Sequence, residues 1–225
     1  GIRDSSTSRG LGDVYKRQCV YGGPSNTLDD CGNVNAGITN GGAMAGASYD
    51  FGNGLTTAVG YAAGESDMAT GLMTKETLDA YGVNAAYTGD NYGFSVTYGL
   101  VETSSVDEDT FTAYNGYYAP EGFPSISVGY EIGEDGSVTD KTADELTSFF
   151  VGLQWDEFGP GTAGVAVGTK TPTVEKTDEQ YMYEAFYSYP VNDGMTITPL
   201  VYVKEGSSET DVDETGLMVK TSFSF

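Results

Sequence analysis

Residues 216–225 read GLMVKTSFSF, and their strict alternation decides the fold. One side of this stretch carries Leu217, Val219, Thr221, Phe223 and Phe225. The other side is more polar and carries Met218, Lys220, Ser222 and Ser224. Successive side chains of a β-strand point to opposite faces, so this stretch predicts a strand with one apolar and one polar surround. A soluble sandwich can show the pattern once, whereas a membrane barrel must repeat it in every strand.

The composition favours an all-β protein. The 225 residues include 32 glycines and 17 tyrosines, with no histidine and a formal charge of −23. No segment approaches the roughly 20 apolar residues of a membrane-spanning helix, but a barrel strand needs only about 9–11 residues. Glycine and tyrosine in many short alternating segments are typical of strands. The acidic balance argues against nucleic acid as a partner, because phosphate binding needs a basic surface.

The first 18 residues show no strand period and hold four of the ten basic residues. Residues 13–18 read DVYKRQ, which looks like the translation of a synthetic transposon end. We therefore interpret residues 1–18 as a cloning or sequencing scar and exclude them from fold reasoning. A disordered native leader is the alternative interpretation.

The remainder divides into strands joined by connections that alternate in length. Short turns rich in glycine, asparagine and proline alternate with longer, acidic connections, as expected where one rim of a membrane barrel carries turns and the other carries external loops. The pattern predicts an antiparallel transmembrane β-barrel over residues 41–225. The eleven candidate strands are 42–51, 55–64, 78–88, 92–102, 109–118, 124–132, 147–156, 162–170, 180–189, 195–204 and 215–225. The longer connections are 65–77, 103–108, 133–146, 171–179 and 205–214.

Most candidate strands have one apolar face, which we expect to meet lipid. Segments 92–100, 126–132, 149–155 and 195–203 follow this rule. In 109–118, Asn115 shares a face with Phe111, so no lipid face is assigned there. Polar and charged residues on the opposite faces are candidates to line a pore, where glycines would leave room for water. The pore-lining candidates are Asp50, Glu131, Gln154, Glu184, Tyr202, Lys204 and Lys220.

No residue set points to catalysis. Without histidine there is no histidine base or histidine metal site, so we expect no enzyme, metal site or cofactor. The acidic stretches 107–109 and 209–214 lack the spacing of a twelve-residue calcium loop. They are more simply a solvated rim that attracts cations to the mouth of a pore.

Several segments resemble a known family. Residues 117–120 (YYAP) with 123–130 (FPSISVGY), 149–156 (FFVGLQWD) with 159–161 (GPG), and 163–168 (AGVAVG) carry the resemblance. So do 184–194 (EAFYSYPVNDG) and 197–199 (ITP). They are similar to the carboxy-terminal half of cyanobacterial outer-membrane porins of the carbohydrate-selective (OprB-like) superfamily, which usually carry an S-layer homology domain upstream.

The resemblance implies a sixteen-stranded barrel, of which the eleven segments would be strands six to sixteen. Residues 19–40 would then be an external loop that can narrow the pore. The resemblance further implies a homotrimer in outer-membrane lipid, with Phe223 and Phe225 as the signal read by the insertion machinery. Peptidoglycan would be bound only through the missing upstream domain.

The function expected is passive diffusion of inorganic ions and small hydrophilic solutes through an outer-membrane porin. A carbohydrate-selective porin is the alternative within transport. A secreted acidic β-sandwich that acts as an adhesin or binding module is the alternative from another class.

Cys19 and Cys31 are predicted to form a disulfide, because an outer-membrane loop matures in an oxidising compartment. Two free thiols are the alternative. Closing a loop of about a dozen residues would stabilise it by roughly 3 kcal/mol. Thiol titration of the unreduced, denatured protein should find no free cysteine, and two titratable thiols would refute the bond.

Overall fold

A computed structural model describes residues 43–63, 73, 78–103, 107–138, 144–175, 177–207 and 211–224. In these ranges the chain forms one sheet of twelve strands, and all of its strand pairings are antiparallel. Among the same residues there is no helix long and apolar enough to cross a membrane. The strands are β1 (Met44–Asp50), β2 (Leu55–Ala62), β3 (Ala80–Thr88), β4 (Tyr92–Glu102), β5 (Glu108–Tyr118), β6 (Ser125–Glu134), β7 (Glu145–Phe158), β8 (Gly161–Thr169), β9 (Thr173–Val174), β10 (Tyr181–Asn192), β11 (Met195–Lys204) and β12 (Glu214–Phe223).

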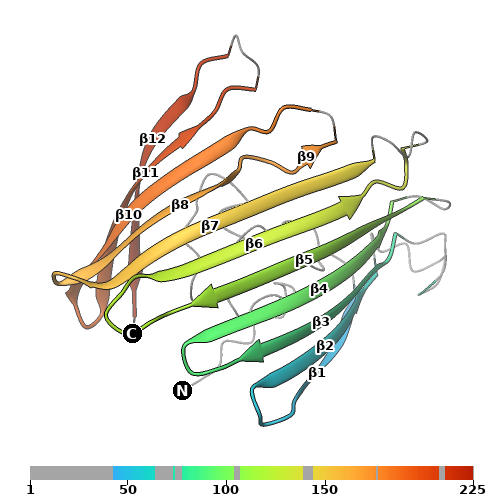
Figure 1. Ribbon diagram of the computed structural model, residues 1–225, viewed down its shortest axis with the longest axis horizontal. Coiled ribbons are helices and arrows are strands. Elements are labelled where there is room, and N and C mark those ends of the chain that lie inside the picture. Colours follow the sequence, from blue (N-terminus) through green and yellow to red (C-terminus); the bar gives the residue numbers. More distant parts are fainter. Residues whose placement is uncertain are drawn as a thin grey trace.

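The order of strands in the sheet follows the order in the sequence. Each long strand pairs with the next, from β1 through β8 and then β10 to β12, while β9 lies off this path and pairs with β7. Figure 1 shows the strands side by side from blue to red across a strongly curved sheet. The predicted all-β antiparallel fold is confirmed. The edge strands β1 and β12 do not pair with each other in the described residues, so the sheet is open.

The short strand β9 was not predicted from the sequence. It lies in the segment 171–179, which we expected to be a connection. β7 begins at Glu145, but it pairs with β8 only from Phe150 onward. The first residues of β7 therefore have an open side, and Leu146 and Thr147 pair there with Val174 and Thr173. An unpaired strand edge is a template for further pairing, which accounts for the additional strand.

The short turn between β1 and β2 forms at Gly52, Asn53 and Gly54, as the sequence predicted. Gly52 and Gly54 have φ angles of 74° and 88°, in a region that other residues rarely adopt. The amide of Gly52 donates to Asp50 Oδ1 at 2.8 Å, and the amide of Leu55 donates to Asn53 Oδ1 at 3.2 Å. These local bonds fix the tight connection between β1 and β2.

The two faces of the sheet are inverted relative to a soluble protein. On β4, Tyr92, Phe94, Val96 and Tyr98 are exposed, whereas the glycine, serine and threonine residues between them are buried. The same alternation runs along β6 (Ser125–Glu134), where the apolar residues are again the exposed ones. We call the face with exposed apolar side chains the outer face, and the buried one the inner face. Exposed apolar side chains in every long strand are what a lipid surround requires.

The register settles the face of β5, which the sequence left open. Tyr114 lies opposite Val96 of β4, and Tyr118 lies opposite Tyr92, so both tyrosines belong to the outer face. Phe111 and Asn115 therefore point inward, and Phe111 is buried. The asparagine that obscured the pattern is an inner-face residue, opposite Ser95 of β4 and Gly129 of β6.

Aromatic rings on the outer face gather at two levels. At the short-turn end, the ring centroids of Tyr87 and Phe94 are 5.7 Å apart, and those of Tyr49 and Phe51 are 4.8 Å apart. At the other end, Tyr61 and Tyr81 are 5.4 Å apart. Two aromatic levels that border an apolar band are typical of barrel girdles at the two membrane interfaces.

The assignment of faces predicts a difference between two lysine substitutions. Val96→Lys places a charge in the middle of the outer face and should lower the free energy of unfolding in lipid vesicles by roughly 2–4 kcal/mol. Gln154→Lys places the same charge on the inner face beside Asp156, and should cost much less. Urea titrations followed by Trp155 fluorescence measure both values. Equal costs would contradict the assignment.

Candidate functional site

The inner face of β3 to β6 is lined by small and hydrogen-bonding side chains. Asn84 and Thr97 are buried, and Asn84 Nδ2 donates to Thr97 Oγ1 at 2.8 Å and to the carbonyl of Val96 at 3.3 Å. Ser95, Ser125 and Ser127 are other buried polar residues on this wall. Because these side chains are short, the wall presents hydrogen-bonding groups close to the backbone.

Two carboxylates lie deep on the inner face. Glu131 is 2% exposed and lies between Ala113 of β5 and Ser148 of β7. Glu184 is also 2% exposed and lies between Ala166 of β8 and Tyr202 of β11. Burying a carboxylate lowers the stability of a protein unless polar or charged groups interact with it. Two buried carboxylates therefore indicate that the inner face supplies polar contacts.

A mixed charged group occupies the inner face of β11 and β12. Lys204 lies opposite Glu214, and Lys204 Nζ is 5.5 Å from the centroid of the Tyr202 ring. The Tyr202 hydroxyl donates to Glu214 Oε1 at 3.0 Å. Lys220 lies opposite Thr198 on the same face. Tyr202 thus contacts both the ammonium group of Lys204 and the carboxylate of Glu214, and the two contacts fix the orientation of its ring.

The remaining predicted residues lie nearer the short turns or outside the described ranges. Asp50 is an exposed inner-face residue that closes the β1–β2 turn, and Gln154 Nε2 donates to Asp156 Oδ1 at 2.5 Å. Phe223 is an exposed outer-face residue at the end of β12. Phe225, Cys19 and Cys31 lie outside the described residues. The disulfide and the assembly signal both stay predictions.

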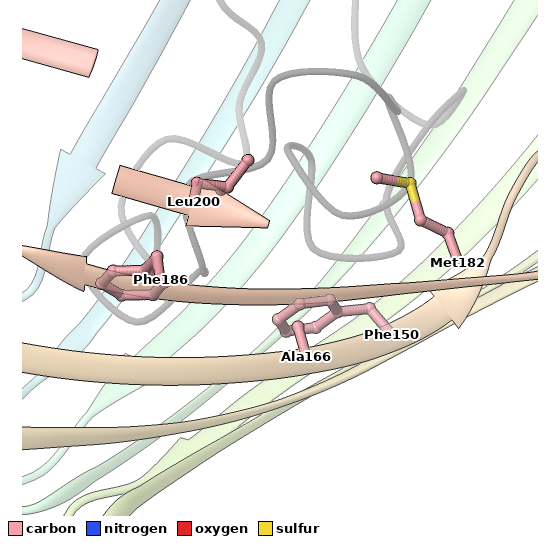
Figure 2. Close-up of a cluster of buried hydrophobic side chains, with 5 residues drawn as sticks. All are labelled: Phe150, Ala166, Met182, Phe186 and Leu200. Atoms are coloured by element: carbon pink, nitrogen blue, oxygen red, sulfur yellow. The ribbon is translucent and has the colours of Figure 1, made fainter. Parts of the chain in front are cut away.

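An apolar cluster on the inner face was missed from the sequence. It consists of Phe150, Ala166, Met182, Phe186 and Leu200, all at least 90% buried, with Tyr202 packed against it. Figure 2 shows the five side chains on one side of β7, β8, β10 and β11. Glu184 lies in this group, two residues from both Met182 and Phe186. A smaller apolar cluster on the same face consists of Phe111 and Ala113, with Val101 and Leu146 packed against it. The inner face is therefore mixed over β3 to β6 and largely apolar over β7 to β11.

Four inner-face glycines lie directly opposite aromatic residues of the neighbouring strand. A methyl group added to any of them would collide with the facing ring, because each ring lies across its glycine. The sequence had suggested that such glycines leave room for water, but at these positions the space is filled by a ring. The pattern was detectable, since glycine opposite an aromatic residue recurs once the hairpins are paired. The pairs are Gly93–Tyr117, Gly133–Phe111, Gly164–Phe186 and Gly216–Tyr202.

This arrangement agrees with a comparison to protein families. The model of the family described as Gram-negative porin matches residues 9–211. The chain belongs to the Gram-negative porin family. The match covers the long strands from β1 to β11 and begins inside the segment that we interpret as a scar. No curated protein matches the chain.

Solved porins share this fold at low sequence identity. A substituted variant of the Rh. blastica porin matches with a TM-score of 0.53 and 16% identity, over 81% of this chain and 55% of the other. An anion-selective porin from Comamonas acidovorans matches with a TM-score of 0.59 and 12% identity, over 81% of this chain and 59% of the other. The chain thus spans just over half the length of these porins. At such identities the likeness shows the fold alone.

The paired glycines predict a sharp difference between two alanine substitutions. Gly164→Ala should displace the Phe186 ring and lower the free energy of unfolding by about 1–3 kcal/mol, as other overpacked sites do. Gly116→Ala is the control, because its new methyl group would have its nearest neighbour at 3.5 Å. Urea unfolding in detergent measures both. No destabilisation by Gly164→Ala would contradict the stacking of the ring on the glycine.

Proposed function

We propose that this porin forms a passive diffusion channel of the outer membrane for inorganic ions and small hydrophilic solutes. The single observation that carries the proposal is the inverted sheet. Its outer face is apolar and exposed, and its inner face over β3 to β6 holds buried hydrogen-bonding groups and Glu131. Water and ions need a polar wall, whereas lipid needs an apolar one. Closure of the wall requires strands beyond those described.

We further propose that the channel prefers cations. The inner face of the strands carries the carboxylates of Asp50, Asp109, Glu131, Glu184 and Glu214, with Asp156 beside Gln154, against the strand lysines Lys204 and Lys220. The chain as a whole carries a formal charge of −23. A wall with an excess of one charge concentrates ions of the opposite sign. The Comamonas acidovorans porin is anion-selective, but at 12% identity its selectivity does not transfer to this chain.

Nothing in the described strands favours a carbohydrate channel over a general one. Of the inner-face aromatic residues in these strands, only Tyr117 and Tyr202 keep part of the ring exposed. Four strands of the sheet lie between β5 and β11, so the two rings form no continuous track for sugars. The OprB-like and cyanobacterial assignments rest on the sequence segments that resemble that superfamily.

The proposed setting of the channel follows from the family. Outer-membrane lipid, the insertion machinery and a homotrimer are the proposed partners. The outer face supports the lipid contact directly, because its apolar residues are exposed over most long strands. The alternative of a soluble sandwich would need a second sheet over this face, and the described residues form a single sheet.

Reversal potentials in a salt gradient across planar bilayers test the selectivity. The wild-type porin should pass cations in preference to anions. Glu131→Gln and Glu184→Gln should each lower the permeability ratio, by up to about fivefold if each charge contributes on the order of 1 kcal/mol at close range in water. Glu121→Gln, on the exposed β5–β6 turn, is the matched control and should change little. An anion-selective wild-type channel would refute the cation preference.

A further inference from the structure

Three carboxylates lie side by side on the outer face, where β3, β4 and β5 meet their long connections. Asp79 directly precedes β3; its carbonyl accepts from the amide of Glu102 at 2.8 Å, and its amide donates to Glu102 Oε2 at 3.3 Å. Glu102 lies directly opposite Glu108 of β5. These three residues form what we call the outer acidic row, along adjacent strand ends that Figure 1 shows side by side.

The neighbouring hairpin repeats the arrangement. Glu134 at the end of β6 lies directly opposite Glu145 at the start of β7, also on the outer face. Thr110 of β5 lies opposite Glu134 and links this pair to the row. Like charges directly opposite each other destabilise a sheet, so two such pairs at one rim call for a compensating cation.

Asp79 is the residue that distinguishes the row from a solvated acidic surface. Its side chain is 0% exposed. Oδ2 accepts from the Tyr81 hydroxyl at 3.4 Å, whereas Oδ1 is buried and accepts no hydrogen bond. Among the described residues no lysine or arginine is paired with Asp79, Glu102 or Glu108. A buried carboxylate oxygen without a partner is expensive, and a bound cation would remove the cost.

The ligand chemistry narrows the cation. Oxygen ligands and two adjacent carboxylates suit Ca²⁺ or Mg²⁺. In the described residues no three acidic or thiol side chains converge on one point, so the protein supplies an incomplete set of ligands. The remaining positions are left to water and to oxygens from outside the chain. Mg²⁺ in particular is commonly held by one or two carboxylates together with phosphate oxygens.

The position of the row indicates where those oxygens come from. The row adjoins Tyr61 and Tyr81, the aromatic pair at the long-connection end of the outer face. Aromatic rings at this level mark the head-group region, where lipid phosphates lie. We propose that the outer acidic row binds a divalent cation between Asp79 and Glu102 and, through it, the phosphate of an anionic lipid. This inference rests on the outer-membrane setting proposed above.

Terbium luminescence tests the cation site in the detergent-folded porin. Tb³⁺ replaces Ca²⁺ at oxygen sites and emits when a nearby tyrosine is excited, and the Tyr81 hydroxyl is 3.4 Å from Asp79 Oδ2. We expect saturable Tb³⁺ emission that CaCl₂ displaces. Asp79→Asn and Glu102→Gln should each weaken Tb³⁺ binding by about tenfold or more, because fewer charged ligands remain.

Matched controls separate this site from general acidity. Asp90→Asn removes a carboxylate beside Tyr92 at the opposite rim, and Glu121→Gln removes an exposed one on the β5–β6 turn; both should leave Tb³⁺ affinity unchanged. If the control variants lose as much Tb³⁺ affinity as the variants of the outer acidic row, the proposed site is wrong. Heat-modified migration on gels verifies folding of each variant. If Asp79→Asn does not fold, the partly exposed Glu102→Gln decides the result.

The lipid contact is tested in mixed micelles. Phosphatidic acid should strengthen Ca²⁺ binding to the wild-type porin, as measured by Tb³⁺ displacement, whereas phosphatidylcholine should not. The gain should be lost in Glu102→Gln. An equal gain from soluble inorganic phosphate would overturn the lipid assignment. Channel conductance is measured in parallel: a conducting porin without Ca²⁺ binding refutes only this inference, whereas Ca²⁺ binding without conductance refutes only the proposed function.

Discussion

Every strand of this sheet is governed by the need to pair backbone groups in an apolar surround. Where lipid covers one face, water cannot satisfy an amide or a carbonyl, so each strand must bond to a neighbour on both sides. The chain meets this demand with a run of hairpins in sequence order. The exposed apolar residues, the two aromatic levels and the tight glycine turns all follow from it. The short strand β9 obeys the same demand, because it covers the open side of β7.

The inner face does not contact lipid, so its side chains can be polar in one region and apolar in another. Over β3 to β6 it carries amide, hydroxyl and carboxylate groups beside a small cluster of Phe111 and Ala113, whereas over β7 to β11 it carries a larger apolar cluster that surrounds Glu184. The opposed glycines and rings allow aromatic residues to lie flat against the wall, which keeps their bulk close to the backbone. The inner face thus joins two chemically different surfaces, and in the proposed channel a solute would meet different contacts on the two sides.

Alternation along each strand was sufficient to predict the sheet, its antiparallel hairpins and most of its faces. It failed at Asn115, where a polar residue shares a face with aromatic ones, and only the register with β4 resolved the assignment. It also gave no indication of the inner apolar cluster, because alternation identifies the face of a residue and not its cross-strand neighbours. Phe186 and Gly164 become meaningful together only after β8 and β10 are paired. The outer acidic row escaped notice for the same reason, since Asp79 is 23 residues from Glu102 in sequence and the two meet only when β3 and β4 are paired.

The sequential order of the strands has a kinetic consequence. Each pairing between long strands joins segments that are neighbours along the chain, so only short loops must close as the sheet grows. Such local pairing favours stepwise growth, in which each new hairpin adds to an edge that the previous one provides. Among the described strands, β1 and β12 each have only one partner and are then the growing ends of the structure. Sealing the wall is the one step that must bring distant parts together, and it would set the pace of assembly.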